Sequence, residues 1–443
     1  MKTTYFKIHE ADNVAIALEQ LAPGSEIQFT GGSCTAAETI PRGHKVALAD
    51  LEPGQDVIKY GYPIGRATKR VPAGSWVHSH NMRTNLEGTL EYEYRPSYSV
   101  RTGEAGTPGT AVPVETAPPA RPAPTPAGPT FKGYRRKNGA VGVRNEIWII
   151  PTVSCANHTA DVLAKLASVD FGDACDGIFA FPHNSGCSQL GDDHRMTQKL
   201  LAAIAKHPNA GGVLLVSLGC ENNNIHEFLP VLGDYDRDRF RVLVTQEAGD
   251  ELGTGLELLR ELAEIVKQDK RVRVPASELK IAFKCGGSDS LSGVTANPLC
   301  GTVADRITSL GGSAVLTEVP EMFGAETILM NRADSRETFE KVVNLINSFK
   351  QYYLDYGQPV YENPSPGNKE GGITTLEEKS LGCVQKGGRA VVSDTLDYGE
   401  QIRRSGLNLM TGPGNDNVSI TDLLPPGYKI SETQLKELLR KRK

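Results

Sequence analysis

No C-x-x-C pair occurs among the eight cysteines of this 443-residue chain, which argues against a zinc ribbon or a thioredoxin-type site. The sequence also lacks G-x-x-x-x-G-K-[ST] and a G-x-G-x-x-G that follows a strand, so a nucleotide enzyme is not expected. No apolar run reaches the roughly 18 residues that a membrane-spanning helix needs. The first residues show neither the apolar core nor the cleavage site of a signal peptide. These absences predict a cytoplasmic protein with no membrane partner and with reduced thiols.

A strong charge of one sign is missing as well. The formal net charge of −5 gives no electrostatic reason to expect nucleic acid or an anionic membrane as a partner. A small molecule is therefore the partner that we expect. A sequence does not show the assembly, and a homodimer is the form that we consider.

Proline marks the clearest boundary in the chain. Residues 101–130 hold eight prolines and almost no large apolar side chain, so this segment cannot offset its ordering entropy and is expected to be a linker. The region before it, 1–100, alternates short apolar runs with Gly/Pro turns, as in a compact, mostly β domain. Within that domain we expect a helix near residues 11–20, with Asp12 as its N-cap.

The region after the linker, 131–443, alternates apolar runs with longer amphipathic stretches. Strands are expected at 146–152, 212–217, 241–244, 280–283, 313–316 and 389–392, and helices at 196–206, 255–267 and 336–350. This alternation predicts an α/β fold with parallel sheets covered by helices. Ligands of such sheets bind at the carboxyl ends of the strands. Polar motifs follow several of these strands, at 154–157, 219–224, 284–290 and 317–321.

Two histidines in the first domain, His78 and His80, predict a metal site. Residues i and i+2 of a strand point to the same face, and a pair of imidazoles suits Fe²⁺, Mn²⁺ or Zn²⁺. The alternative is a pair of surface histidines near the rim of the domain. His44 is a candidate to join this pair or to act in acid–base chemistry, against the alternative of an ordinary loop histidine.

Two glycine-containing turns carry further reactive groups. His183 and Cys187 lie together after the apolar run 177–181, where a strand is expected to pass into a loop. A nucleophilic pair is disfavoured because no third residue that would orient it is evident. The turn at 285–289 offers successive backbone N–H groups, which can bind a carboxylate, although a plain tight turn has the same sequence.

The segment 371–380 combines glycines, hydroxyl groups and Lys379, as in a lid or a polyol-binding loop. Thr374 and Glu377 also have the spacing of a helix capping box, with Thr374 as the cap. The two interpretations are compatible.

Seven ordered blocks of this sequence resemble the altronate/galactarate dehydratase family. The blocks lie at 59–84, 133–146, 181–194, 218–223, 284–298, 317–326 and 364–388. The blocks FPHNSGCSQLGDDH and LGCENN resemble the altronate branch more than the galactarate branch. Because the blocks cover both domains in order, the resemblance is more specific than any single glycine-rich loop.

The resemblance implies a small SAF-type (β-clip) domain at the N-terminus, followed by a large α/β catalytic region. It implies the removal of water from a sugar acid such as D-altronate, giving a 2-keto-3-deoxy acid. It also implies a divalent metal as cofactor, Fe²⁺ or Mn²⁺.

This chemistry needs a base for the C2 proton, an acid for the departing C3 hydroxyl, and groups that stabilise the enediolate formed in between. The candidate catalytic residues are His44, Lys45, His183 and Lys379. The candidates for substrate binding are Arg66, Arg144, Ser288, Asp289, Asn297, Thr374 and Thr375. The candidate metal ligands are His78, His80 and Glu318, and Glu321 is a further acid in the same motif.

Several alternatives stay open from the sequence. Within the family, the substrate could be galactarate, or sulfolactate in a sulfo-lyase. The resemblance is expected to end at Ser419, so an inactive truncated remnant or a binding module is an alternative of another class. A further alternative is an iron–sulfur dehydratase whose ligands come from Cys155, Cys187, Cys220 or Cys285.

Overall fold

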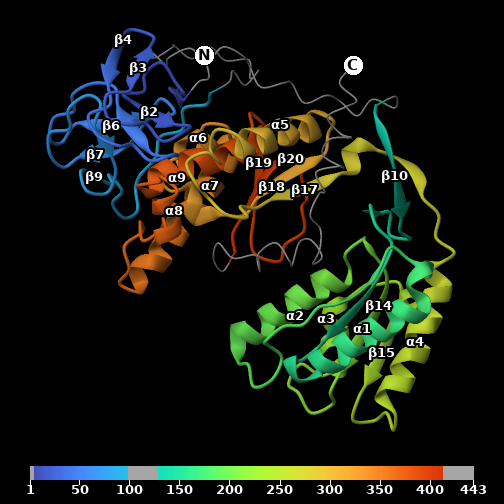
Figure 1. Ribbon diagram of the computed structural model, residues 1–443. Coiled ribbons are helices and arrows are strands. Elements are labelled where there is room, and N and C mark those ends of the chain that lie inside the picture. The colour runs from blue at the N-terminus through green and yellow to red at the C-terminus, as the bar shows by residue number, and fades with distance from the viewer. Residues whose placement is uncertain (1–3, 98–127, 413–443) are drawn as a thin grey trace. The chain divides into compact units, whose positions relative to one another are not determined.

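The computed structural model describes residues 4–97 and 128–412 (Figure 1). Residue contacts group these into two compact units. Unit 1 contains 4–97, 279–398 and 402–412, and unit 2 contains 128–278 and 399–401. The expected linker, apart from 128–130, and the C-terminal segment beyond 412 lie outside the described residues.

The first part of unit 1 is built from short strands, as expected. They are β1 (Tyr5–Phe6), β2 (Val14–Ala17), β3 (Glu26–Phe29), β4 (Gly32–Thr35), β5 (Lys45–Ala47), β6 (Asp56–Lys59), β7 (Tyr62–Ala67), β8 (Trp76–Val77) and β9 (Met82–Arg83). All pair antiparallel, in the sheets β1-β2-β5-β8, β3-β4 and β6-β7-β9.

The helix expected over 11–20 is wrong. This stretch contains β2, whose four residues are all buried and which pairs with both β1 and β5. Asp12 caps a loop instead, because its carboxylate accepts hydrogen bonds from the backbone N–H groups of His9 and Gly61. Pairing on both edges outweighs the helical propensity of an alanine- and leucine-containing segment.

The second part of unit 1 is an α/β layer. Its parallel sheet has the order β17-β18-β20-β19, from β17 (Lys280–Phe283), β18 (Ser313–Leu316), β19 (Val392–Leu396) and β20 (Gly406–Met410). The helices are α5 (Ala296–Ser309), α6 (Glu326–Met330), α7 (Arg336–Asp355), α8 (Pro366–Glu370) and α9 (Leu376–Cys383). The strand expected at 389–392 begins only at Val392, and β20 was not expected.

One hydrophobic core joins the two parts of unit 1. Val57, Ile64 and Met82 of the β domain belong to the same buried cluster as Phe323 and Leu381 of the α/β layer. Since burial of each such side chain contributes about 1.5–3 kcal/mol, the two parts are held in a fixed relation. The buried polar residues between them are therefore held in place as well.

Unit 2 is a second α/β layer, with a parallel sheet of order β13-β12-β14-β15 (Figure 1). Its elements are β12 (Glu146–Pro151), α1 (Asn157–Phe171), β13 (Ile178–Ala180), α2 (Gly191–Ala205), β14 (Ala210–Ser217), α3 (Ile225–Leu232), β15 (Phe240–Val244) and α4 (Glu251–Val266). Alternate residues of β12 serve two cores: Ile147 and Ile149 face α1 and α4, whereas Trp148 and Ile150 face α2 and α3. The expected α/β class with parallel sheets is confirmed.

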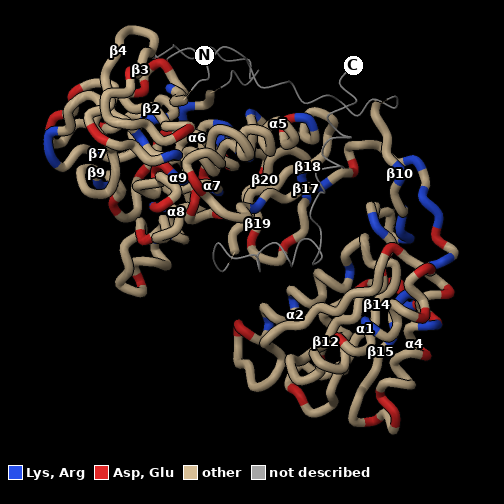
Figure 2. The backbone as a smooth tube through the Cα atoms, viewed as in Figure 1, with Lys and Arg blue, Asp and Glu red and all other residues tan. Residues whose placement is uncertain are grey.

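A small antiparallel sheet completes unit 2, with the order β11-β10-β16, from β10 (Thr130–Arg135), β11 (Val141–Gly142) and β16 (Val272–Pro275). Lys and Arg gather on and beside these strands (Figure 2). Arg136 pairs with Asp269 and Arg271 with Asp176, so much of this positive charge is compensated locally. In the described part of the chain, no helix has the length and apolar character to cross a membrane.

Candidate active site

Three charged side chains meet in the interior of unit 1. Lys45 from β5 donates to Glu378 Oε2 at 2.8 Å, and Lys59 from β6 donates to Glu378 Oε1 at 2.7 Å. All three residues are buried, and Glu378 lies on α9, so this network ties the β domain to the α/β layer. Two buried cations share one carboxylate, and the surplus positive charge favours an anionic ligand.

The network separates the pKa values of its members. Burial alone would raise the pKa of Glu378, but Lys45 and Lys59 outweigh burial and lower it to about 2. Burial lowers the pKa of Lys45 to about 8 despite the attraction of Glu378. Lys59 moves the other way, because Glu378, Tyr60 and Asp12 outweigh its burial and raise its pKa. Lys45 is thus the member that can lose its proton near neutral pH.

The histidines lie beside this network. Lys45 also donates to Thr374 Oγ1 at 2.8 Å, and the same hydroxyl lies 2.9 Å from His78 Nδ1. Burial and the nearby Lys45 lower the pKa of His78 to about 4, so its ring is neutral. Both ring nitrogens of His44 have partners, Trp76 Nε1 at 3.1 Å and the Glu370 carbonyl at 3.0 Å.

Trp76 organises the two histidines of the predicted metal pair. Its ring stacks on His78, with centroids 5.6 Å apart, and contacts His80 at 5.1 Å. His78 is buried and held by Thr374, whereas His80 is exposed. The pair therefore offers one fixed imidazole and one solvent-facing imidazole.

The start of α9 is pinned to the β domain. Its N-cap is Thr375, whose side chain accepts from the Glu378 N–H, so the capping box expected at Thr374 and Glu377 is wrong by one residue. The Thr375 hydroxyl donates to the Ile64 carbonyl, and Glu377 accepts from the hydroxyl of Thr84. These bonds join the start of α9, whose residues are all buried, to the β domain.

A small pocket adjoins the network and collects four of the expected residues, Ser288, Asp289, Asn297 and Lys379. Its other polar lining residues are Lys59, Tyr60, Ser290, Ser292 and Glu378.

Each of the four has a local partner. Lys379 Nζ contacts Glu321 at 2.9 Å and the amide oxygens of Asn363 and Asn368. Asn297 donates to the Gly382 carbonyl, Asp289 closes a turn by accepting from the N–H of Ser292, and the hydroxyl of Ser288 lies 2.7 Å from Cys285 Sγ.

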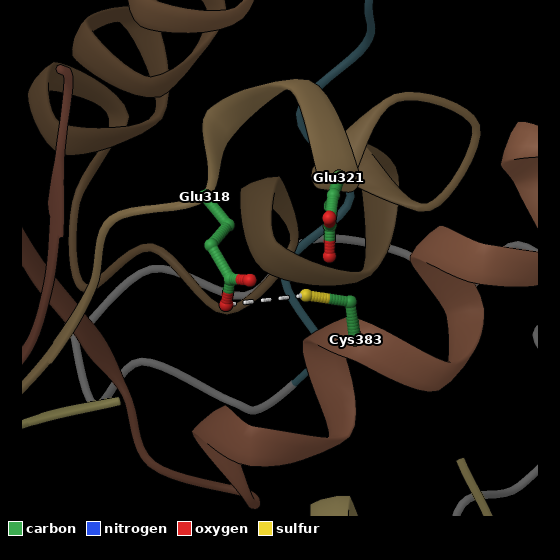
Figure 3. A group of neighbouring side chains, drawn as sticks. All are labelled: Glu318, Glu321 and Cys383. Atoms are coloured by element: carbon green, nitrogen blue, oxygen red, sulfur yellow. Dashed lines mark hydrogen bonds between the residues drawn. The ribbon is translucent and has the colours of Figure 1, made fainter. Parts of the chain in front are cut away.

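Glu318, Glu321 and Cys383 form a second buried group (Figure 3). Within the described residues, these are the three potential metal ligands whose donor atoms all lie within 4.8 Å of one another. Glu318 precedes the short 3-10 turn that carries Glu321, and Cys383 ends α9.

Lysines already compensate this group. Lys386 Nζ lies 2.7 Å from Glu318 Oε2 and 3.2 Å from Cys383 Sγ, Lys284 lies 3.4 Å from Glu318, and Lys379 pairs with Glu321. Burial raises the pKa of Cys383 well above its usual value, so its sulfur keeps the proton. Three ammonium groups beside two carboxylates and a neutral thiol do not fit a divalent cation, and no metal-dependent step follows from this group.

The structure does not bring Glu318 together with His78 and His80. His78 contacts Thr374 before α9 begins, whereas Glu318 contacts Cys383 at the other end of this helix. An eight-residue helix is about 12 Å long, far more than two ligands of one ion are apart.

The remaining predicted residues have structural partners. Arg66, in β7, donates to Asn85 Oδ1 at 2.6 Å. Arg144 belongs to unit 2 and pairs with Glu146 at the amino end of β12, opposite to the edge where ligands of such sheets bind. His183, also in unit 2, uses both ring nitrogens for the backbone, Nε2 with the Pro151 carbonyl and Nδ1 with the Ser185 N–H.

Comparisons with known proteins match most of the chain. Residues 3–85 match the altronate/galactarate dehydratase SAF domain, residues 133–267 the second domain of D-galactarate dehydratase/altronate hydrolase, and residues 276–432 the C-terminal domain of D-galactarate/altronate dehydratase. The altronate dehydratase of Escherichia coli (strain K12) is 47% identical over 425 residues, 96% of this chain and 82% of that protein. The chain belongs to the altronate/galactarate dehydratase family.

Two further relatives place the chain within the altronate/galactarate dehydratase family. The altronate dehydratase of Bacillus subtilis (strain 168) is 46% identical over 429 residues, covering 96% of this chain and 82% of that protein. The galactarate dehydratase (L-threo-forming) of Escherichia coli (strain K12) is 30% identical over 441 residues, covering 96% and 80%. The resemblance to the altronate branch is confirmed. The C-terminal match extends to residue 432, so the expectation that the resemblance ends at Ser419 is corrected.

The sequence alone did not point to several residues of the candidate site in unit 1. Glu378 and Lys59 form its buried centre, and Lys386 neutralises Glu318. Lys59 opens the first family block and Glu378 lies in the last one, so both were within quoted motifs. A signal was present in the sequence: each of these charged residues lies in an otherwise apolar or hydroxyl-rich segment. Because an unpaired charge is rarely buried, such a residue is expected to have a partner of opposite charge.

Proposed function

We propose that this chain removes water from D-altronate and forms 2-keto-3-deoxy-D-gluconate. The observation that carries the proposal is the 46–47% identity to two altronate dehydratases over 96% of the chain. The 30% identity to a galactarate dehydratase favours altronate over galactarate as the substrate. Within unit 1, Lys59 and Lys379 offer two ammonium groups for an acid in a small pocket that the carboxylates of Asp289 and Glu378 also line.

The reaction moves one proton and one hydroxyl group. A base takes the proton from C2, the C3 hydroxyl leaves after it gains a proton, and the enol that results becomes a ketone. The charge that builds up on the substrate carboxylate needs fixed positive groups. Lys59 and Lys379 line the pocket, and Lys59 stays protonated because its pKa is raised.

Lys45 is the group that we propose as the base. Its pKa of about 8 is near the working pH, which is where a general base is most effective. Its Nζ donates to the Gly372 carbonyl, Thr374 and Glu378 at 2.8 Å each, so its position is fixed. Ser288 and Asn297 would bind hydroxyl groups of the substrate from the pocket wall.

Membership of the family favours dependence on a divalent metal, and we propose Fe²⁺ or Mn²⁺. When bound, such an ion supplies a Lewis acid for the carboxylate and the departing hydroxyl. The neutral ring of His78 has the protonation state of a ligand, but the lysines around Glu318 argue against that carboxylate as another.

The test is an anaerobic assay of the purified chain with D-altronate, galactarate and sulfolactate in parallel, each with Fe²⁺, Mn²⁺ or a chelator. We expect metal-dependent formation of the 2-keto-3-deoxy acid from D-altronate, at a rate well above that from galactarate. Turnover of galactarate alone, or sulfite release from sulfolactate alone, would reassign the substrate. Folded protein that turns over none of the three would favour an inactive remnant or a binding module.

Location and assembly are proposals of the same kind. Eight free cysteines suit a reducing compartment, which supports the cytoplasm. For the assembly we propose a homodimer with two-fold symmetry, the commonest form of soluble oligomer. Light scattering on a sizing column would test it, and a monomer mass at micromolar concentration would reject it.

A further inference from the structure

Three cysteines of unit 2 follow three adjacent strands at the same edge of the sheet. Cys155 comes after β12, Cys187 after β13 and Cys220 after β14, and the sheet order is β13-β12-β14. All three strands are parallel, so their carboxyl ends lie at one edge, across about 10 Å at about 4.8 Å per strand.

These three cysteines are also the exposed ones. The structure describes all eight cysteines, and Cys155, Cys187 and Cys220 are exposed, whereas the other five are partly or fully buried. Cysteine is usually among the most buried residue types. Three exposed thiols at one edge of one sheet therefore call for a ligand rather than a packing role.

Backbone hydrogen bonds join the three loops. The Ser154 N–H donates to the Ser185 carbonyl at 2.9 Å, which links the loops of Cys155 and Cys187. The Asn223 N–H donates to the Gly186 carbonyl at 3.2 Å, and the Asn223 side chain donates to the Thr152 carbonyl at 2.9 Å. Each loop is thus bonded to another one within a few residues of its cysteine.

Buried side chains fix each loop from below. Glu221 accepts from the hydroxyls of Thr152 and Ser217 and from the Gly219 N–H, which holds the turn of Cys220. His183 bonds to the backbone through both ring nitrogens, and Asn157 exchanges two hydrogen bonds with the main chain of His183. The loops are preorganised, whereas the thiols have only long contacts, Cys220 Sγ accepting from Gln246 Nε2 at 3.6 Å and Cys187 Sγ lying 3.8 Å from Ser188 Oγ.

The spacing of the thiols discriminates between metals. A single zinc ion with 2.3 Å bonds would hold its sulfurs about 3.8 Å apart. In the described part of the chain, the group of three donor atoms within 4.8 Å of one another is Glu318, Glu321 and Cys383, so at least one pair of these three thiols is farther apart than that. A cube of iron and sulfide binds each thiolate to a different iron, and this arrangement suits the wider spacing.

We propose that Cys155, Cys187 and Cys220 bind a [4Fe–4S] cluster, and that the fourth iron has no thiolate from these loops. The proposal rests on the proposed function only for the class of ligand that this iron would take, an oxygen donor such as a carboxylate. Dehydration is neutral in electrons, so a cluster of this kind would supply a Lewis acid and not an electron carrier. No external oxidant or reductant is needed for turnover.

The test uses the full chain, purified without oxygen and treated with Fe²⁺ and sulfide. We expect about four iron and about four acid-labile sulfide per chain, with the broad visible absorption of an iron–sulfur cluster. Cys155→Ser, Cys187→Ser and Cys220→Ser should each lower the iron and sulfide content at least about fivefold. Their thermal unfolding should stay near that of the parent, because exposed substitutions have small effects on stability.

The matched control is Cys175→Ser. Cys175 lies in the same unit but before β13, at the amino edge of the sheet, where its Sγ contacts the Gly177 carbonyl. This variant should keep the full iron and sulfide content. A parent chain that takes up no sulfide, or takes up only a single metal ion, would overturn the proposal, and so would equal losses in Cys175→Ser.

Failure of the cluster and failure of the proposed function have different outcomes. Iron and sulfide are measured without substrate, so a loaded cluster without altronate turnover would reject the function and keep the cluster. Turnover with Mn²⁺ by a chain that takes up no iron and sulfide on reconstitution would reject the cluster and keep the function.

Discussion

The two units of the chain stabilise their polar centres by different means. In unit 1 the centre is charged: Lys45, Lys59 and Glu378 are buried together, and a second set of lysines surrounds Glu318. In unit 2 the carboxyl edge of the sheet is held mainly by hydrogen bonds to the backbone, as at His183. The stability of a charged centre depends on pH and on each of its charges. The stability of an edge bonded to the backbone depends instead on the conformation of its loops and on the space around them. Unit 1 is thus suited to bind anions and move protons, and unit 2 is suited to hold thiolate side chains at fixed positions.

The largest effect is expected for Lys45→Met. We expect kcat for altronate to fall by about 100-fold or more, as for the loss of a general base. Stability should change little, because Lys59 still neutralises Glu378 and the charged form of Lys45 is costly to bury. Steady-state kinetics and thermal unfolding measure the two effects separately.

Lys350→Met is the matched control for this variant. Lys350 is another fully buried lysine of unit 1, with Glu326 at 2.8 Å and the Tyr92 hydroxyl at 2.9 Å. Its loss leaves Glu326 without a cation, which should cost about 3–5 kcal/mol, while kcat of the folded protein stays at the parent value. If both variants lose kcat to the same extent, Lys45 has a structural role and is not the base.

Glu378→Gln tests the charged centre through stability. The pKa of Glu378 is about 2 in the folded state, below its ordinary value of 4.5, so its contribution is complete above pH 4.5 and is lost as the pH falls toward 2. A difference of about 2.5 pKa units corresponds to about 3 kcal/mol. Urea unfolding at pH 7 and at pH 3 should show a difference in the parent that is smaller in Glu378→Gln. An identical pH dependence in both proteins would show that Glu378 is not the titrating group.

Lys45 predicts a second pH dependence, which lies in the alkaline range and not in the acidic one. Its folded pKa of about 8 lies below the ordinary 10.5, so the penalty for burying its charge is relieved as the pH rises from about 8 to 10.5. As the proposed base it must be neutral, and kcat/KM should rise with pH through about 8. A rise centred near pH 4 would point to His78 instead.

The regular framework of both units was predictable from the sequence. Runs such as 146–152 and 313–316 are buried on both faces of parallel sheets, so they are almost continuously apolar and easy to recognise. The stretch 11–20 was not, because its alanines and leucine suit a helix, and only pairing with β1 and β5 decides for a strand. A local sequence pattern therefore fails to predict the secondary structure where pairing with distant strands decides it.

The candidate site was predictable in its motifs but not in its contacts. Ser288, Asn297 and Lys379 were chosen as polar residues after strands or in glycine-rich loops, and the structure gathers them at one pocket. The bond from Lys59 to Glu378 spans 319 positions of sequence, and no periodic pattern reports such a pairing. Arg144 shows that a family motif alone does not predict a place near the ligand edge of a sheet. It lies within such a motif, but at the amino edge of its sheet.

Gly186→Ala tests the shape dependence of unit 2. The glycine has φ of +102°, and a Cβ at this position would lie 2.3 Å from the Thr152 carbonyl oxygen, so the loop of Cys187 must move. We expect a loss of about 2 kcal/mol or more and an at least severalfold lower iron and sulfide content after reconstitution. Gly191→Ala is the control in the same segment, because its φ is also positive but nothing lies within 4 Å of its Cβ. Equal effects of the two substitutions would show that backbone strain alone, and not the contact with Thr152, is responsible.

The smallest effect is expected for Asn297→Ala in unit 1. Asn297 donates one neutral hydrogen bond to the Gly382 carbonyl at 2.9 Å, near the end of α9, so about 1 kcal/mol of stability should be lost. Because Asn297 also lines the pocket, KM for altronate should rise a few-fold while kcat stays near the parent value. Thr302→Ala is the control on the same helix, since its hydroxyl bonds only to the Pro298 carbonyl within α5. A rise in KM with Asn297→Ala alone would assign substrate binding to this side chain, and an unchanged KM would leave it the structural task of holding α9.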